Sequence, residues 1–263
     1  MDSESYGEEL IWKAKAVAAI CPLSCLFFTA VNILVKSHFT PQKCATFPGR
    51  WRMFVTSWVH AVICAVAALT IILTEEEWMG DSDRGFYLHL MSSGYFIYDT
   101  VFKYTSSEKL GSFEMYAHHI LSIFFITVSQ FPPCGRISTY SPWDYLCEVA
   151  NVFLHGRKII VMLGLRESVL YKWLTVLFFA SFTVFRFIPQ ILVFVMMNVD
   201  YWSTSRLSLF CYLIAIPQQL LLVVIGTHVA YNIIRRSALY ARKVAPHDNS
   251  EKKMHKTAQK RNQ

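Results

Sequence analysis

The sequence contains little charge for its length, which excludes an ordinary soluble domain. Asp, Glu, Lys and Arg make up 16% of the 263 residues, whereas soluble domains carry about 25%. Hydrophobic residues make up 54%, the mean hydropathy is +0.34, and several long runs carry no charge. Because these runs are continuous rather than alternating, they favour membrane-spanning helices over the strands of a β-barrel. We therefore predict an all-α polytopic membrane protein.

Several motifs of secreted, metal-binding and hydrolytic proteins are absent. The seven cysteines form no C-x-x-C pair, no His/Cys spacing is typical of a zinc site, and no N-x-S/T sequon occurs. We interpret the cysteines as packing residues, and we expect neither a metal nor a bound cofactor. The absence of a G-x-S-x-G motif disfavours a Ser-His-Asp hydrolase.

The net charge of +7 comes from one end of the chain. Residues 235–263 contain nine Lys and Arg and only two acids, Asp248 and Glu251, so the rest of the chain is neutral. We predict a basic cytosolic tail at 237–263 that is weakly attracted to anionic lipid headgroups. We expect membrane lipids as partners and no nucleic acid, and the sequence identifies no protein partner.

Seven apolar segments follow one another along the chain. We predict helices at 16–35, 53–74, 86–102, 115–131, 140–163, 171–197 and 207–234. Segment 16–35 lacks the basic start and the cleavage site of a signal peptide, so we expect a retained first helix. Segment 140–163 contains five ionisable residues, so a re-entrant segment is an alternative to a span.

The distribution of Lys and Arg predicts the orientation in the membrane. With seven spans and the N-terminus outside the cytosol, the cytosolic segments hold 19 Lys and Arg and the opposite side holds five. If segment 140–163 did not cross, the division would weaken to 17 against seven. Basic residues accumulate on the cytosolic side of membrane proteins, so we predict seven spans with the C-terminus in the cytosol.

Ionisable side chains within these segments are the candidates for a site, because they are costly at that depth and usually face a bundle interior. Asp99 lies in segment 86–102, and the pair His118 and His119 lies in the next. Neighbouring residues on a helix point about 100° apart, so one imidazole can face a cavity while the other contacts another helix. We predict all three as candidate catalytic residues, with an imidazole as general base or acyl-accepting nucleophile. The alternative is that both rings are satisfied core groups.

Further polar side chains recur at helical spacing on the other segments. Segment 140–163 carries four polar residues spaced by four, three and four positions, which predicts one inward-facing stripe. These are Asp144, Glu148, Asn151 and His155. Arg186 cannot lose its charge, so we expect it beside Asp99 or Glu148. The alternative is that such groups only hold the helices in register. The residues predicted to line a polar cavity or to be structural are Ser57, His60, Tyr95, Glu148, Asn151, His155, Arg186 and Gln190.

Five short stretches on successive segments resemble the TLC-domain family, which includes the ceramide synthases and the translocon-associated membrane proteins. They are Ser57-Trp58-Val59-His60, Gly94-Tyr95-Phe96-Ile97-Tyr98-Asp99-Thr100, His118-His119, Glu148-Val149-Ala150-Asn151-Val152-Phe153-Leu154 and Phe185-Arg186-Phe187-Ile188-Pro189-Gln190. The similarity runs from about Arg50 to Arg236. We therefore assign a TLC domain to residues 50–236, after an N-terminal segment at 1–49 that contains the first helix.

The stretches around Asp99 and Glu148 look most like the subgroup that governs plasma-membrane fluidity and phospholipid acyl composition. The resemblance implies a helical bundle around a lipid-accessible cavity and a plasma-membrane location, with the endoplasmic reticulum as alternative. It also implies a role in limiting the long polyunsaturated chains of membrane phospholipids. Ile-Leu-Ser-Ile-Phe-Phe replaces the polar and acidic run that follows the His pair in ceramide synthases, and a homeobox-like domain is absent. Two functions stay open: a regulator of membrane lipid composition, or a His-dependent lipid acyltransferase with acyl-CoA as donor.

Overall fold

A computed structural model of the chain describes the backbone of residues 3–75, 83–111, 113–131 and 134–261. Side chains at 3–5, 113–114, 117, 125–130, 135–136 and 236–261 lie outside the description. Within the described residues every regular element is helical, so the predicted fold class is confirmed. The chain forms two compact units, Met1–Gln219 and Leu220–Gln263.

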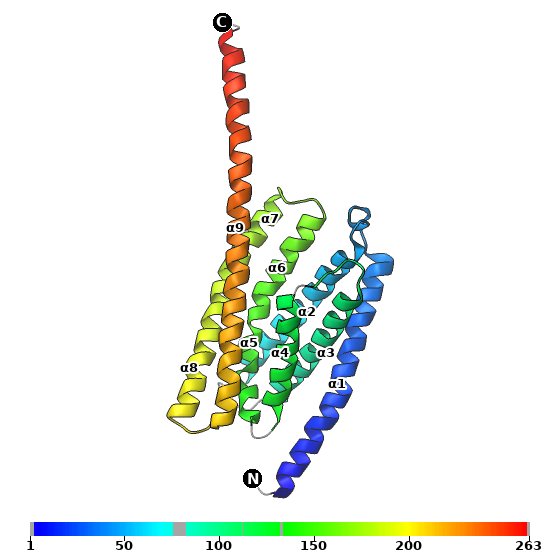
Figure 1. Cartoon of the computed structure of the whole chain (residues 1–263), viewed down its shortest axis with the longest axis vertical. Helices are drawn as coiled ribbons and strands as arrows, with labels where there is room; N and C mark the ends of the chain where they lie inside the picture. Colours follow the sequence, from blue (N-terminus) through cyan, green and yellow to red (C-terminus); the bar gives the residue numbers. More distant parts are fainter. Residues whose placement is uncertain (1–2, 76–82, 112, 132–133, 262–263) are drawn as a thin grey trace. The chain divides into compact units, whose positions relative to one another are not determined.

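The helices follow the order predicted from the apolar segments (Figure 1). They are α1 (Ser3–His38), η1 (Gln42–Cys44), α2 (Pro48–Thr74), α3 (Asp83–Thr105), α4 (Phe113–Gln130), η2 (Gly135–Tyr140), α5 (Ser141–Tyr145), α6 (Cys147–Met162), α7 (Val169–Phe182), η3 (Thr183–Phe187), α8 (Ile188–Trp202) and α9 (Leu209–Arg261). Counting α5–α6 and α7–η3–α8 as one segment each, the described chain contains seven. Four are apolar and long enough to span a membrane by themselves: Tyr6–His38, Pro48–Thr74, Val169–Trp202 and Leu209–Arg235. The molecule is therefore a multi-pass membrane protein.

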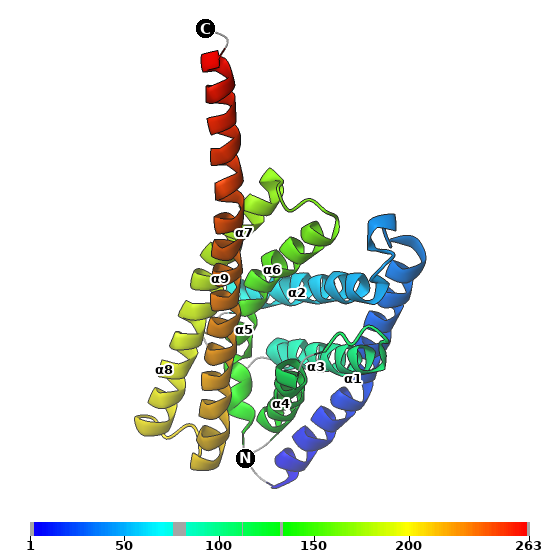
Figure 2. The same ribbon diagram turned by 45° about the horizontal axis from the view of Figure 1, so that its top comes forward.

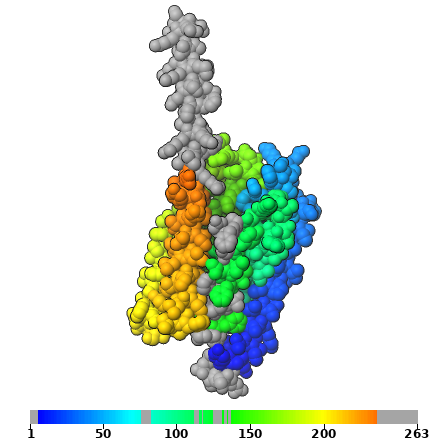
Figure 3. Space-filling view, viewed as in Figure 1, coloured from blue at the N-terminus to red at the C-terminus, as the bar shows by residue number. Residues whose placement is uncertain are grey.

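Within the first unit, α1 packs along α3, and α2 packs against both α3 and α6 (Figures 1 and 2). The contact between α1 and α3 is close because both helices carry small residues there. A Cβ atom on Gly94 would lie 2.6 Å from Ser24 Cβ, and Ser24 Oγ donates a hydrogen bond of 2.5 Å to the carbonyl of Met91. Figure 3 shows the side chains of the two helices side by side on one face.

Segment 140–163 is not one helix but the end of η2 followed by α5 and α6. Its two ends contact different elements of the bundle. At the end of α6, Cys44 Sγ in η1 donates a hydrogen bond of 3.7 Å to the carbonyl of Met162. At the other end, the Tyr140 hydroxyl donates a hydrogen bond to Asp200 in α8. The contacts of α6 with η1 and of η2 with α8 therefore support a crossing segment over a re-entrant one.

The connection between α3 and α4 lies at the same end as η1. Glu108 in that connection accepts hydrogen bonds from the backbone N–H groups of Gly49, at 2.5 Å, and Arg50, at 2.9 Å. N–H groups in the first turn of a helix have no partner within the helix, so the Glu108 carboxylate pairs two of them in α2. A carboxylate at this position is also favoured by the helix dipole. A Cβ atom on Gly49 would lie 2.7 Å from Glu108 Oε1, so a larger residue here would displace the Glu108 carboxylate from the cap.

Two of the cysteines are not the packing residues we predicted. Cys134, before η2, and Cys211, in the first turn of α9, form a disulfide with a Cα–Cα distance of 5.3 Å. Disulfides persist in compartments outside the reducing cytosol. The bond therefore supports a non-cytosolic position for this end of the bundle, in agreement with the division of Lys and Arg.

The second unit continues α9 from Leu220 as a helix that ends at Arg261. His228 Nε2 and Asn232 Nδ2 lie 2.8 Å apart, one turn from each other. The basic side chains of the predicted tail, residues 237–263, lie outside the described side chains.

Candidate functional site

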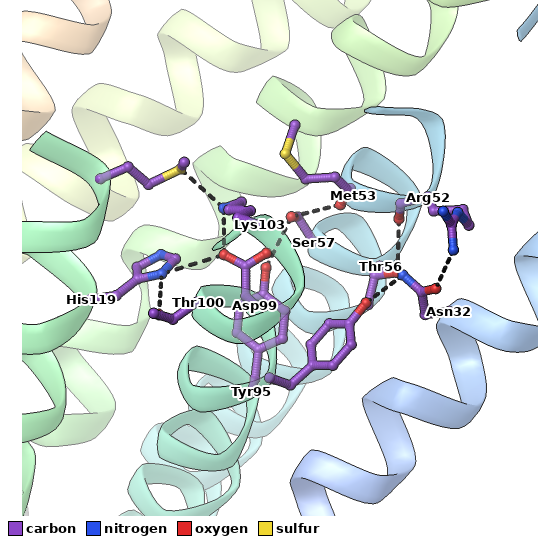
Figure 4. A network of polar contacts seen from close by, with 12 residues as sticks. Asn32, Arg52, Met53, Thr56, Ser57, Tyr95, Asp99, Thr100, Lys103 and His119 are labelled. Carbon is purple, nitrogen blue, oxygen red and sulfur yellow. Dashed lines mark hydrogen bonds and ion pairs between the residues drawn. The ribbon is translucent and has the colours of Figure 1, made fainter. Parts of the chain in front are cut away.

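A buried ion pair lies at the centre of the predicted site (Figure 4). Asp99 in α3 is 1% exposed, and it accepts a hydrogen bond from the ammonium group of Lys103, one turn further along the helix. Lys103 Nζ also lies 3.0 Å from Met115 Sδ in α4. Asp99, one of the two carboxylates expected beside Arg186, is therefore not its partner, because a lysine on the same helix occupies it.

Lys103 is a residue of the site that the hydropathy of the sequence does not indicate. The apolar segment ends at Phe102, so the lysine is assigned from sequence to the polar loop that follows. In the structure α3 continues to Thr105, and Lys103 is buried inside the bundle. The spacing contains the missing signal, because an acid four residues before a lysine on a helix favours an ion pair.

His119 is the imidazole that contacts this ion pair. Its Nδ1 atom lies 3.4 Å from Asp99 Oδ2 and 3.2 Å from Thr100 Oγ1. The side chain is buried, so the ring is held against α3 by both contacts. We call Asp99, Lys103 and His119 the ion-pair cluster. The expected proximity of Asp99 to one ring of the His pair is present.

His118 occupies a different environment from its neighbour, as the angle between adjacent helical positions predicts. It is half-buried, and its ring lies 5.7 Å from that of His119 and 6.2 Å from that of Phe96, between centroids. Its ring forms no hydrogen bond with a side chain in the described part of the chain. One imidazole of the pair is thus positioned by α3, while the other has nitrogens available for another contact.

The predicted residues of α2 and α3 meet on the opposite side of Asp99. The Tyr95 hydroxyl donates a hydrogen bond of 2.9 Å to Ser57 Oγ. The ring of His60 stacks on Tyr95 with centroids 3.8 Å apart, and His60 Nε2 lies 3.0 Å from Ser92 Oγ. Ser57, His60 and Tyr95 therefore form one buried group, in which each polar side chain has a partner.

Arg186 does not form the direct ion pair that we predicted. Its Nη1 lies 3.5 Å from Asn151 Oδ1, and Asn151 Nδ2 donates a hydrogen bond of 3.0 Å to Glu148 Oε1. Among the described side chains, no carboxylate lies within 4 Å of the guanidinium. An amide therefore separates Arg186 from Glu148. The carboxylate itself points toward α2, with Oε2 4.0 Å from His60 Nδ1.

Three buried nitrogens near this amide have no hydrogen-bond partner in the described part of the chain. They are His155 Nδ1, Arg186 Nε and Gln190 Nε2. Gln190 is 2% exposed, so water does not reach most of its surface. We call Glu148, Asn151, His155, Arg186 and Gln190 the polar seam, because they lie on two facing segments, α6 and η3–α8.

The fourth member of the predicted stripe, Asp144, is linked to the seam through Gln219, which also donates a hydrogen bond to the carbonyl of Gln190. It belongs to α5, and the break at Leu146 separates it from α6. Its Oδ1 atom accepts a hydrogen bond of 3.0 Å from Gln219 Nε2 in the first unit's part of α9. The predicted stripe is therefore divided between two helices, α5 and α6.

The two groups offer different chemistry. In the ion-pair cluster, an imidazole with one nitrogen near a carboxylate can accept a proton or an acyl group on the other. The polar seam offers N–H donors that can bind an oxygen acceptor. No group of three or more His, Cys, Asp or Glu in the described residues has the arrangement of a metal site.

Comparison with known proteins shows the family. The model of the TLC domain matches residues 50–235, so the chain belongs to the TLC-domain family. It is 28% identical to TLC domain-containing protein 1 of Gallus gallus over 189 residues, which are 68% of this chain and 73% of that protein. It is 26% identical to TLC domain-containing protein 2 of Danio rerio over 165 residues, or 61% and 66% of the two chains. No solved structure matches the chain.

A further relative, TLC domain-containing protein 1 of Mus musculus, is 27% identical over 150 residues. The match covers 54% of this chain and 58% of the mouse protein. It spans less than two thirds of the mouse and zebrafish relatives. Membership of the family supports a role connected with membrane lipids. The particular activity has to be inferred from the residues of the site.

Proposed function

We propose that this protein regulates the acyl composition of membrane phospholipids and, through it, membrane fluidity. The observation that carries the proposal is the ion-pair cluster buried in a TLC-domain bundle. Removing a carboxylate and an ammonium from water costs several kcal/mol per ion, and apolar side chains of similar volume often pack at least as stably. An ionisable cluster inside a membrane bundle is therefore better explained by a functional contact than by packing.

The position of the cluster fits a lipid of the cytosolic leaflet. Lys103 lies two residues before the end of α3, and His119 is the seventh residue of α4. At 1.5 Å per residue, His119 lies about 9 Å from the start of its helix. This end of the bundle is the one we predict to face the cytosol, so the cluster lies near the depth of lipid ester groups. We favour the plasma membrane as the location, with the endoplasmic reticulum as the alternative.

One observation favours a second candidate function, a lipid acyltransferase that uses the His pair. Asp99 lies 3.4 Å from one nitrogen of His119 and can fix its tautomer, which leaves Nε2 with the lone pair. A nucleophile oriented by a second group is the usual arrangement in covalent acyl transfer. Acyl-CoA arriving from the cytosol would be the donor. His119 is buried and His118 is half-buried. Single variants of the two histidines identify which ring reacts.

The experiment is phospholipid acyl profiling in cells that lack the protein and re-express single variants. The wild type, His118→Ala and His119→Ala are compared at equal protein level. His38→Ala is the matched control, because His38 is an exposed histidine at the end of α1. We expect the wild type and the control to restore the profile of normal cells.

The outcomes separate the two functions. A profile that does not change when the protein is lost would refute the regulatory role. Loss of the effect in one histidine variant, with normal protein level, would favour the acyltransferase. Full restoration by both histidine variants would exclude the acyltransferase and leave a regulator that acts through other contacts.

A further inference from the structure

The polar seam contains donors that the protein itself does not satisfy. Arg186 Nε and Gln190 Nε2 have no acceptor in the described part of the chain, and both atoms are buried. Buried donors are almost always hydrogen-bonded in folded proteins, and leaving one unpaired is destabilising. Since Arg186 and Gln190 are four residues apart, they share one face of their helix. Two unpaired donors on one buried face indicate a bound acceptor.

The local helix geometry supports a functional reason for this face. Thr183–Phe187 form a π-helical turn, η3, between α7 and α8. Pro189 follows within two residues, and it has no N–H to continue the regular hydrogen-bond pattern. Single π-turns within α-helices occur frequently at functional sites. Here the wider turn contains Arg186, whose guanidinium has no carboxylate within 4 Å among the described side chains.

The environment of Arg186 is polar but incomplete. Its guanidinium contacts Asn151 Oδ1 at 3.5 Å and lies 5.8 Å from the ring of Phe182. A guanidinium has five N–H donors, so most of its capacity remains for another group. Arg186 therefore has donors left for a further acceptor.

The depth of the polar seam in the membrane indicates which kind of acceptor it can bind. Arg186 is the eighteenth of the 34 residues in the span Val169–Trp202, close to its middle. A phosphate would have to leave the interface and enter the apolar region to reach it, which is costly for a charged group. An acyl carbonyl is uncharged and enters with its own hydrocarbon chain. Two or more N–H donors directed at one oxygen are the groups that bind such a carbonyl.

We propose that Arg186 and Gln190 form a subsite that binds the carbonyl oxygen of a lipid acyl group inside the bundle. The inference rests on the proposed function, because it assigns an acyl lipid as the molecule that enters the bundle. His155 Nδ1, which also has no partner among the described side chains, lies one turn from Asn151 on α6. Arg186 and Gln190 are positioning residues in this arrangement.

The test compares two lipids that differ in the carbonyl. The full-length protein is purified in detergent, and its unfolding temperature is measured with 1,2-dioleoylglycerol and with the ether analogue 1,2-di-O-oleylglycerol. We expect the ester lipid to raise the unfolding temperature by roughly 5–10 °C at about one hundred times its dissociation constant. The ether lipid should have little effect. Arg186→Met and Gln190→Leu should each remove the response to the ester.

A matched pair of glutamines separates binding from folding. Gln190→Leu removes an unpaired buried donor, so the lipid-free variant should unfold at the same temperature as the wild type or higher. Gln219→Leu is the control, because Gln219 donates to Asp144 at 3.0 Å and to the carbonyl of Gln190 at 3.1 Å. It should lower the unfolding temperature and keep the response to the ester.

Three results would overturn the subsite. They are equal responses to the ester and the ether, a response of Gln190→Leu equal to that of the wild type, and a response to di-O-oleyl phosphatidylcholine that Arg186→Met removes. The last result would identify a phosphate as the acceptor. If the ester response holds while cells lacking the protein keep a normal phospholipid profile, the subsite stands and the proposed function fails.

Discussion

Buried polar side chains are paired at the end of the bundle that carries the disulfide. In the polar seam, by contrast, several have no partner in the described part of the chain. At the disulfide end, His89 contacts Ser141 through Nε2 and lies 3.3 Å from the Tyr145 hydroxyl through Nδ1, while Tyr140 bonds to Asp200. In the seam, three buried nitrogens have no partner in the described part of the chain. Paired groups stabilise the fold, whereas unpaired groups reduce stability and are retained where a ligand binds. The comparison assigns stability to one region and recognition to the other.

The orientation of the two ends can be tested first, because the expected effect is all or none. A tag at the C-terminus should be cleaved when protease is added to the cytosolic side of sealed vesicles. The reason is the 19-to-five division of Lys and Arg together with the disulfide at the opposite end. Protection of the tag in sealed vesicles, with cleavage only after detergent is added, would reverse the assignment of the two ends.

The largest change in stability is expected in the ion-pair cluster. Asp99→Asn removes the charge opposite Lys103, which is 5% exposed, and leaves a buried ammonium unpaired. We expect a loss of about 3–5 kcal/mol, measured as a lower unfolding temperature and a lower yield of monodisperse protein. Asp83→Asn, at the exposed start of the same helix, is the control and should change little. A stable Asp99→Asn variant would show that the pair is not a stabilising contact.

The disulfide should have the next largest effect. Cys134→Ser or Cys211→Ser opens a bond between positions 77 residues apart, and such a loss typically costs about 2–4 kcal/mol. The unfolding temperature of the wild type should fall on addition of reductant, and that of either variant should not respond. Cys25→Ser, at a free and half-buried cysteine of α1, is the control. If reductant leaves the wild type unchanged, the disulfide end does not supply the stability that the comparison assigns to it.

The smallest effect is expected at the cap of α2. Glu108→Gln removes the charge that faces the N–H groups of Gly49 and Arg50, and we expect a loss of about 1 kcal/mol or less. Glu8→Gln, at an exposed position of α1, provides the control for charge loss. Thermal unfolding at low and high salt measures both. A loss as large as that of Asp99→Asn would mean that this cap, and not the buried pair, determines the stability of this end of the bundle.

Much of the fold could be predicted from the sequence because long apolar runs have few alternatives in a membrane. The seven segments and their order follow from hydropathy, and the contact between Asp99 and the His pair follows from their positions on consecutive segments. The segment 140–163 was harder, because its polar residues lower its hydropathy below that of an ordinary span.

The partners of the charged groups could not be predicted in the same way. Hydropathy ends the third segment at Phe102 and so places Lys103 outside it, which leaves Asp99 and Glu148 as the expected partners of Arg186. In the structure Asn151 contacts Arg186 instead. The pairing of Cys134 with Cys211 depends on how the connections fold back, and spacing along the chain does not contain that information. Which of several possible partners a residue contacts depends on the three-dimensional packing of the helices.

The central claim is that the ion-pair cluster serves lipid regulation rather than packing, and a double variant tests it most directly. Asp99→Leu combined with Lys103→Met removes both charges together, so neither is left buried and unpaired, and the protein should fold at least nearly as well as the wild type. The measurement is the phospholipid acyl profile of cells that lack the protein and express this variant at wild-type level. Our account predicts that the variant fails to restore the profile that the wild type restores. Full restoration by the double variant would contradict it.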